Sequence, residues 1–178
     1  VRGIVILYFF AAGFLHARGE PMLRWCRWEG KKLGDKLITE PLREVGMFLR
    51  DNAAATDVLA ATEAGVVPYY SGLTFIDMLG LVDLHIASMP GGLHQKFDAT
   101  YVLSRSPRLI LLGYEETPKG LVAKWLPDQQ MAAHPDFLAN YTEVKRWPRD
   151  MDGPNGGMVN GCMILYSKNS EGATPLPE

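Results

Sequence analysis

The feature that most constrains the fold is a set of three short apolar runs, bounded by breaks and accompanied by helical patterns. The runs are DVLAA (57–61), LTFIDM (73–78) and RLILLGY (108–114). Runs this short and this uniformly apolar are typical of strands buried on both faces of a sheet. Helical spacing at Pro41–Asp51, Asp83–Met89 and Phe97–Ser104 alternates with them. The pattern predicts an α/β fold, a three-layer sandwich around a small, mostly parallel sheet.

The C-terminal part of the pattern predicts how this sheet is completed. A short helix is expected at Phe137–Tyr141, and a half-buried strand at Tyr141–Trp147. After a loop rich in Asp, Gly and Pro, Met158–Ser167 is expected to close the sheet as a final strand, antiparallel to its neighbour.

Composition limits the function classes. The 178 residues are 47% hydrophobic and 21% charged, which fits one globular domain and excludes a wholly disordered chain. A formal charge of −2 gives no general attraction to a polyphosphate backbone, so a role in nucleic-acid binding is not expected. The two cysteines, Cys26 and Cys162, form neither a disulfide framework nor a zinc-binding CxxC pair.

The N-terminal stretch predicts contact with a membrane. Residues 3–15, GIVILYFFAAGFL, carry no charge, and MLRWCRW (22–28) interleaves Trp with Arg. We expect residues 1–18 to be the end of a transmembrane helix and 19–40 an interfacial connector. A buried strand or core helix of a soluble domain is the alternative for the first segment, and a solvated amphipathic connector for the second. Residues 41–168 are then the soluble α/β domain, and 169–178 a flexible tail.

Most motifs that would identify an enzyme are missing. The chain has no GxGxxG, no GxxxxGK[ST] and no HExxH, and Ser71 lacks the preceding glycine of a nucleophile elbow. We therefore expect no cofactor and no metal site. Asp150 and Asp152 form a DxD, which is more often a solvated turn than an ion site, and Asn140–Thr142 is a glycosylation sequon relevant only in a eukaryotic secretory route.

Polar side chains gather in or just after loops that follow the predicted strands, where ligand sites of α/β sheets are found. Carboxylates, imidazoles and an amine could bind hydroxyls or phosphate, and a tyrosine ring could stack on a sugar. In the alternative interpretation, the aspartates cap turns or helices and the tyrosines fill the core. The candidate substrate-binding residues are Tyr69, Tyr70, Asp77, Asp83, His85, His94 and Lys96.

Three stretches carry a family resemblance: Ala64–Ala87 (AGVVPYYSGLTFIDMLGLVDLHIA), Gly91–Leu112 (GGLHQKFDATYVLSRSPRLILL) and Ala132–Val144 (AAHPDFLANYTEV). Together they resemble the C-terminal soluble domain of bacterial polytopic glycosyltransferases of the GT-C type, the group that contains mycobacterial-type terminal arabinofuranosyltransferases. The resemblance spans roughly Pro41 to Tyr166, and IDMLGLVDLHIA is its most specific piece. Where this chain has Leu93, His94, Gln95 and Lys96, the family pattern more often has Gly-His-Glu-Lys, so an acid–base role for that segment is not inherited.

The resemblance implies an extracytoplasmic domain on the bacterial plasma membrane, in an enzyme that transfers a sugar from a polyprenyl-phosphate donor to a cell-envelope glycan or lipid acceptor. Family members place their catalytic acid in a loop between early membrane helices, so no catalytic residue is expected in this chain. Its own part would be to assist acceptor binding or to cap the site. Two alternatives remain: a non-catalytic, membrane-tethered module that binds glycan or protein, and a complete soluble α/β enzyme.

Overall fold

The computed structural model describes residues 39–92, 94–148, 151–152, 158–169 and 176–177. The predicted membrane segment and connector, 1–18 and 19–40, lie outside this part apart from the last two residues, and most of the predicted tail lies outside it too. The described elements belong, except for the first residue of the first helix, to one compact unit, Glu40–Glu178. In chain order they are α3 Thr39–Asn52, β1 Val58–Ala61, α4 Val66–Ser71, β2 Thr74–Asp77, α5 Leu84–Ser88, α6 Ala99–Ser104, β3 Leu109–Thr117, β4 Gly120–Ala123, α7 Leu126–Ala132, α8 Pro135–Asn140, β5 Tyr141–Pro148, β6 Met151–Asp152, β7 Met158–Val159 and β8 Gly161–Lys168.

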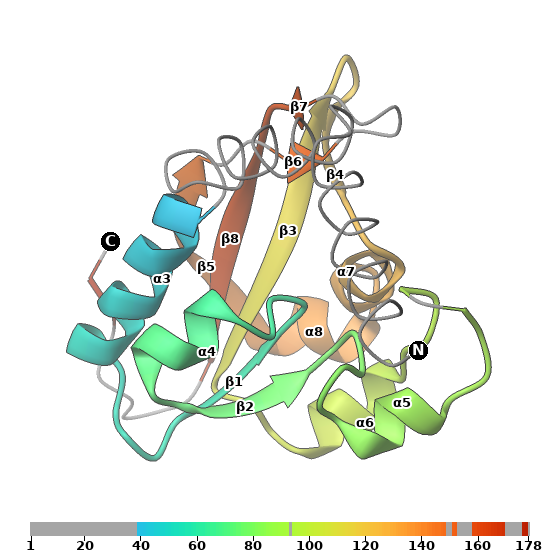
Figure 1. Cartoon of the computed structure of the whole chain (residues 1–178), viewed down its shortest axis with the longest axis horizontal. Coiled ribbons are helices and arrows are strands. Elements are labelled where there is room, and N and C mark those ends of the chain that lie inside the picture. Colours follow the sequence, from blue (N-terminus) through green and yellow to red (C-terminus); the bar gives the residue numbers. More distant parts are fainter. Residues whose placement is uncertain (1–38, 93, 149–150, 153–157, 170–175, 178) are drawn as a thin grey trace, which may run out of the picture. The chain divides into compact units, whose positions relative to one another are not determined.

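A six-stranded mixed sheet forms the centre of the unit (Figure 1). Its order is β2-β1-β3-β8-β5, and β4 pairs with the distal half of β3. β1 pairs in parallel with β2 and with β3, whereas β8 is antiparallel to both β3 and β5. By direction, β1, β2, β3 and β5 run one way, and β4 and β8 run the other. The α/β class is confirmed, and so is the antiparallel closing strand.

Helices cover both faces of the sheet, which gives the predicted three layers. Successive strand residues alternate between the faces, because side chains in a strand have a period of two. Leu59, Leu109 and Leu111 pack against α3 and α4 on one face, in a core that also holds Trp147 and Leu165. On the other face, the intervening strand residues pack against α5, α6, α7 and α8; these are Ala60, Ile110 and Leu112.

The elements expected from the sequence are present, although the expected strand Met158–Ser167 is divided into β7 and β8. Four further elements were not predicted: α4, β4, α7 and the two-residue strand β6. α4 follows the first strand although it contains Pro68, which is tolerated because it lies in the first turn. β4 returns from β3 through a tight turn at Gly120, where φ is 111°. α7 begins directly after it, with Pro127 at its start. Turn and start signals for β4 and α7 were present, but the four-residue strand, GLVA, is too short to be recognised by periodicity.

Candidate functional site

The carboxyl ends of β1 and β2 lie at one edge of the sheet, which we call the carboxyl edge. β1 lies between β2 and β3, so the chain leaves β1 towards one side for β2 and then crosses to the other side for β3. Such a reversal of strand order marks the usual ligand position of an open α/β sheet. The residues that follow β1 and β2 here are Thr62, Glu63 and the segment from Met78 to Asp83.

Asp77 ends β2 and organises the loop that follows it. Its side chain is fully buried, and it accepts hydrogen bonds from the backbone N–H of Leu79 at 2.9 Å and of Val82 at 2.7 Å. Gly80 in this loop has φ 72° and packs against α5, where a Cβ would lie 2.8 Å from the backbone nitrogen of Ala87. Asp77 therefore holds the loop, as the capping interpretation expects.

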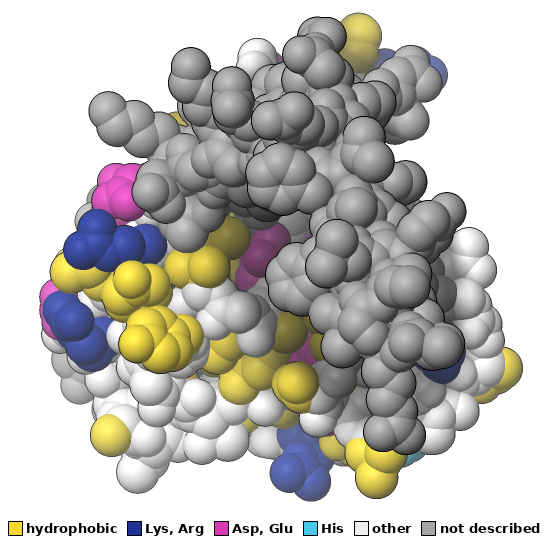
Figure 2. All heavy atoms as spheres, viewed as in Figure 1, with side chains coloured by type: hydrophobic (Ala, Val, Ile, Leu, Met, Phe, Trp, Pro, Cys, Tyr) yellow, Lys and Arg dark blue, Asp and Glu magenta, His cyan; other side chains and the backbone are white. Residues whose placement is uncertain are grey.

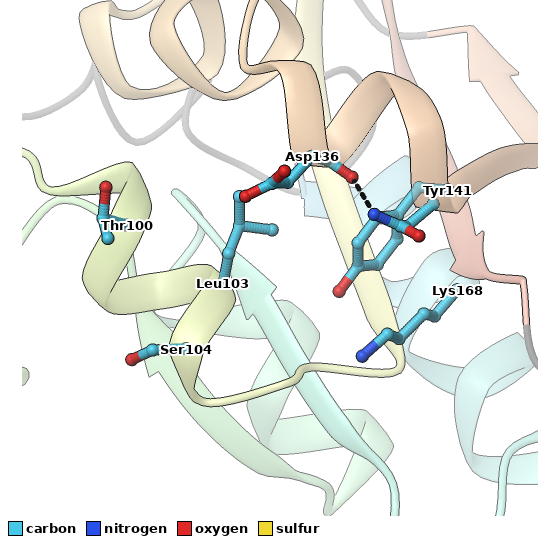
Figure 3. A pocket seen from close by; sticks show the side chains of 7 residues that line it. Thr100, Leu103, Ser104, Asp136, Tyr141 and Lys168 are labelled. Carbon is cyan, nitrogen blue, oxygen red and sulfur yellow. Dashed lines mark hydrogen bonds between the residues drawn. The ribbon is translucent and has the colours of Figure 1, made fainter.

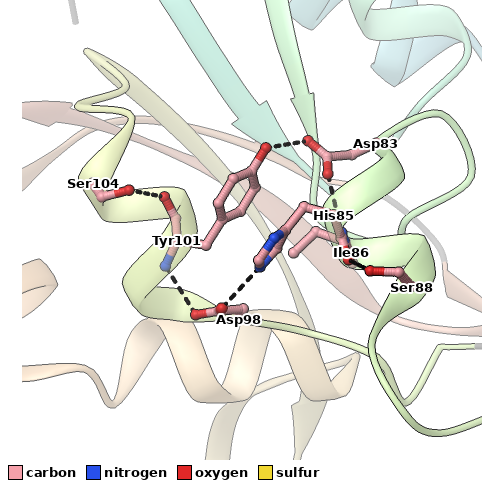
Figure 4. Close-up of polar contacts among 7 residues, drawn as sticks. All are labelled: Asp83, His85, Ile86, Ser88, Asp98, Tyr101 and Ser104. Carbon is pink, nitrogen blue, oxygen red and sulfur yellow. Dashed lines mark hydrogen bonds and ion pairs between the residues drawn. The ribbon is translucent and has the colours of Figure 1, made fainter.

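Asp83 and His85 belong to a polar cluster that joins α5 to α6, the α5–α6 cluster (Figure 4). Asp83 caps α5 by accepting from the N–H of Ile86 at 3.1 Å, and it also accepts from the hydroxyl of Tyr101 at 3.1 Å. His85 Nε2 lies 3.0 Å from Asp98 Oδ2, and the His85 ring stacks on Tyr101 with centroids 3.9 Å apart. The structure thus brings two of the predicted residues together with two that were not predicted, Asp98 and Tyr101.

The electrostatics of this cluster keep Asp98 charged. A hydrogen bond from the N–H of Tyr101 and the contact with His85 lower the pKa of the Asp98 carboxyl. The side chains of His85 and Asp98 are partly exposed. The pair can therefore present an imidazole and a carboxylate to hydroxyl groups of a ligand, although most of its hydrogen bonds are already made within the protein.

The two predicted tyrosines differ in exposure. Tyr69, on α4, is 80% exposed, and its ring meets that of Tyr70 edge-on at 5.1 Å. Tyr70 is half-buried, and the guanidinium of Arg43 lies 5.6 Å from the centre of its ring. Figure 2 shows hydrophobic and basic side chains side by side over α3 and α4, and acidic side chains recessed nearer the middle of this face. Tyr69 therefore has the more accessible ring of the two.

His94 and Lys96 make separate contacts. Lys96 donates to the backbone carbonyl of Ala87 at 2.7 Å, which ties its loop to the end of α5. His94 has φ 63°, and its ring lies 4.5 Å from that of Trp125. Its Nδ1 atom is buried without a hydrogen-bond partner in the described part of the chain. Neither residue joins the α5–α6 cluster through these contacts.

Asp128 is a buried carboxyl that the sequence interpretation missed. It lies near the point on β3 where pairing with β1 ends and pairing with β4 begins. β1 pairs with Leu109–Leu111 and β4 with Tyr114–Thr117, and Asp128 is fully buried beside this junction. It accepts from the N–H of Trp125 at 3.3 Å and from the hydroxyl of Thr62 at 3.4 Å. Burial raises the pKa of Asp128 to about 7. The Pro-Asp pair after Trp125 signals a helix start, but nothing in the sequence indicates that this aspartate is buried.

The described part of the chain contains neither a cluster of metal ligands nor a helix suited to a bilayer. Within the described ranges, no three His, Cys, Asp or Glu side chains are grouped so that they could hold a metal ion. None of the helices in those ranges has the length and apolar character needed to span a bilayer. The DxD aspartates, Asp150 and Asp152, have no described side chains.

Comparison with known proteins gives one family. Residues 32–166 match the model of a family described as a domain of unknown function, DUF8728. No curated protein matches the chain significantly. No solved structure does so either. Since the match covers well over half of its length, the chain belongs to the DUF8728 family.

Proposed function

We propose that this chain is the extracytoplasmic domain of a bacterial membrane glycosyltransferase, which moves a sugar from a polyprenyl-phosphate donor to a cell-envelope glycan or lipid acceptor. The domain assists acceptor binding or caps the site, and the catalytic residues lie elsewhere in the enzyme. One observation carries the proposal beyond the sequence resemblance: exposed hydrophobic side chains lie directly beside the α5–α6 cluster at the carboxyl edge.

The hydrophobic residues are Leu81, Val82 and Leu84, which are 61%, 72% and 84% exposed. Leu81 and Val82 directly precede Asp83, and Leu84 lies between Asp83 and His85, the two cluster residues of this segment. The hydrogen bond from Val82 N–H to Asp77 holds the loop in this conformation, so the hydrophobic side chains do not turn inward. Adjacent hydrophobic side chains on a surface usually mark an interaction site.

A lipid-linked sugar has the matching chemistry. It combines an apolar chain with a hydroxyl-rich head, so it could place the chain against Leu81, Val82 and Leu84 and the head towards His85 and Asp98. Tyr69 supports the same ligand class, because an exposed aromatic ring is a stacking face for a sugar. The location on the outer side of the plasma membrane is part of the same proposal.

The test is a transfer assay with the complete gene product that contains this chain, in native membranes. We would measure transfer of radiolabelled sugar from polyprenyl-phosphate donors to envelope acceptors, for the wild type and for Leu84→Ser. Leu84 is too exposed for its replacement to disturb the core. We expect kcat/KM to fall about tenfold, because the variant loses the contact that buries this leucine against the bound lipid chain. Leu138→Ser is the matched control, since Leu138 on α8 is 65% exposed and lies outside the segment.

Loss of transfer in Leu84→Ser with normal transfer in Leu138→Ser supports the proposal. Equal activity in all three proteins would remove the assigned role of the segment. Absence of transfer from any polyprenyl-phosphate donor, with the protein correctly inserted, would remove the glycosyltransferase assignment.

A second candidate is a membrane-tethered module that binds glycan or protein without catalysis. The observation that favours it is the saturation of the α5–α6 cluster, in which Asp83 accepts two hydrogen bonds and Asp98 is bonded to both His85 and Tyr101. Such a module would bind saccharides as the isolated 178-residue chain and show no transfer. Binding by the chain together with an inactive full-length protein would favour this candidate.

A further inference from the structure

We propose that a pocket at the opposite edge of the sheet binds a sugar that carries an anionic group, a uronic acid or a sugar phosphate. The pocket has a volume of about 320 Å³ and lies among α6, α8 and the end of β8. It contains none of the cluster residues Asp83, His85, Asp98 and Tyr101, and none of the exposed segment Leu81–Leu84; the two sites are joined through α6, where the Ser104 hydroxyl donates to the carbonyl of Tyr101. It is therefore a second binding site, and the proposal stands apart from the function proposed above.

Its position follows from the sheet topology. Tyr141 begins β5 and pairs with Lys168, the last residue of β8, at the edge where β3 starts. Helix α6 ends just before β3, and α8 runs directly into β5. The carboxyl edge, where β1 and β2 end, is the opposite one.

The pocket floor is fixed and uncharged. The hydroxyl of Tyr141 donates to the backbone carbonyl of Pro107 at 2.6 Å, and the ring stacks on Phe137 with centroids 5.3 Å apart. Burial raises the pKa of Tyr141 to about 12, so the phenol stays neutral at physiological pH. Together with Leu103, this ring offers an apolar surface that the flat face of a sugar ring can cover.

The rim carries the polar groups. Figure 3 shows Asp136 and Lys168 on opposite sides of the pocket, with Leu103 and Tyr141 between them. The side-chain amide nitrogen of Asn140 donates to the backbone carbonyl of Asp136 at 2.8 Å, and this bond does not use the acceptor capacity of the amide oxygen. Within the described residues, the ammonium of Lys168 is bonded to no other group.

These groups define the ligand class. A carboxylate and an amide accept hydrogen bonds from sugar hydroxyls, and a lysine across the pocket attracts an anionic substituent at the other end of the same small molecule. A simple anion would use Lys168 but not Asp136, and it would be repelled by that carboxylate. A neutral sugar would leave Lys168 unpaired. The volume is at the small end of the range for ligand pockets, which fits a single sugar unit.

The test is a titration of the full 178-residue chain, labelled with nitrogen-15 and kept in detergent micelles, followed by amide chemical shifts. The probes are glucuronate, glucose 1-phosphate, glucose and inorganic phosphate. We expect one or both anionic sugars to shift the signals of Ser104, Asn140 and Lys168, and each to bind more tightly than glucose or phosphate. Comparison of glucuronate with glucose 1-phosphate shows whether the pocket prefers a uronic acid or a sugar phosphate.

Two variants test the residues. Lys168→Met removes the cation, and it should weaken binding of the anionic sugar about tenfold, as expected for one charge-assisted hydrogen bond. Lys119→Met is the matched control, because Lys119 is an exposed lysine in the β3–β4 turn, and it should bind as the wild type does. Asp136→Asn tests the hydroxyl side, and it should reduce the preference for glucose 1-phosphate over inorganic phosphate.

Several outcomes would overturn the proposal. Glucose binding as tightly as glucuronate and glucose 1-phosphate would exclude a role for the cation. Inorganic phosphate binding as tightly as glucose 1-phosphate would reduce the pocket to a simple anion site. Absence of shifts at all three reporter residues, in a chain with a dispersed spectrum, would exclude the site. None of these results bears on sugar transfer by the full-length protein, so the two proposals fail independently.

Discussion

At the residue scale, the polar positions found by sequence divide into those that hold the fold and those that face solvent. Asp77 accepts two backbone hydrogen bonds in the core, and Lys96 is bonded to a backbone carbonyl. Tyr69 is exposed, and His85 is partly so. Sequence pattern could place all four near the carboxyl ends of strands, but it could not separate these roles, because a capping aspartate and a ligand-binding aspartate occupy the same kind of position.

Replacement of Asp77 tests its role in holding the loop. In Asp77→Asn one of the two backbone N–H groups faces an NH₂ group in place of an acceptor. We expect the free energy of unfolding to fall by about 2–3 kcal/mol, the usual cost of a buried unsatisfied group beside a lost charge-assisted bond. Urea unfolding followed by circular dichroism measures this change. Glu44→Gln, on the exposed side of α3, should change it by less than about 0.5 kcal/mol; equal effects in both variants would contradict the assignment.

Asp128 predicts an unusual dependence of stability on pH. Its pKa is about 7 in the folded protein and about 3.9 in the unfolded chain, so the folded state holds the proton more tightly. The contribution of Asp128 to stability is therefore fully present below about pH 4 and is lost as pH rises to about 7. We expect Asp128→Asn to lose this decline, whereas Asp51→Asn, at an exposed position, should retain it. Urea unfolding at half-unit steps from pH 4 to 8 measures it, and an identical profile in Asp128→Asn and wild type would refute it.

At the element scale, the segment from β2 into α5 shows what sequence could and could not give. The apolar runs predicted β1, β2 and β3, and Asp83 caps α5, as the capping interpretation expected. Helix α6 begins after its cap Asp98, two residues later than the start predicted at Phe97, and this cap was not predicted. The conformation of the loop between Asp77 and Asp83 could not be predicted, because it depends on a buried carboxylate and on contact with a helix that comes later in the chain. The burial of Asp128 could not be predicted for the same reason, because it depends on the pairing of β1 and β4 with successive parts of β3.

Gly80 gives a test of this loop with an internal control. Gly72 and Gly80 have nearly the same left-handed φ, 66° and 72°, but a Cβ has open space at Gly72 and overlaps α5 at Gly80. Alanine at either position incurs about 1–2 kcal/mol for the left-handed conformation, and only Gly80→Ala adds overlap, which costs about 1–3 kcal/mol more. We expect thermal unfolding to show the larger loss of stability for Gly80→Ala. Equal losses would show that the loop and α5 can separate without cost.

At the scale of the whole molecule, the central strand of the sheet is better protected against local opening than the strands at its edges. Leu109, Ile110, Leu111 and Leu112 are fully buried, because β3 pairs with β1 and β8 and is covered on both faces. β4 pairs only with β3 among the described strands, and three of its four residues are exposed. Protection against local opening therefore differs greatly between adjacent segments.

Hydrogen exchange measured by mass spectrometry checks this order. Amides of Ile110–Leu112 should exchange only through global unfolding, and those of Gly120–Val122 should exchange at least a hundredfold faster. Phe48→Ala should speed exchange in β5, because Phe48 on α3 packs edge-on against Trp147 at 5.2 Å. Phe48→Leu, which keeps most of the apolar contact, is the control. Equal exchange rates in β3 and β4 would contradict this predicted difference in local stability.

The bulge in β5 has a consequence for behaviour at high concentration. β5 ends the described sheet, and its register with β8 shifts between Glu143 and Lys145. Glu143 and Arg146 form an ion pair on this strand, and Pro148 at its end has no N–H to donate. These features make the free edge of β5 irregular and charged, so it is a poor template for hydrogen bonding to a strand of a second molecule. At high protein concentration this edge should therefore not pair with a second molecule, so no fibre should grow from it.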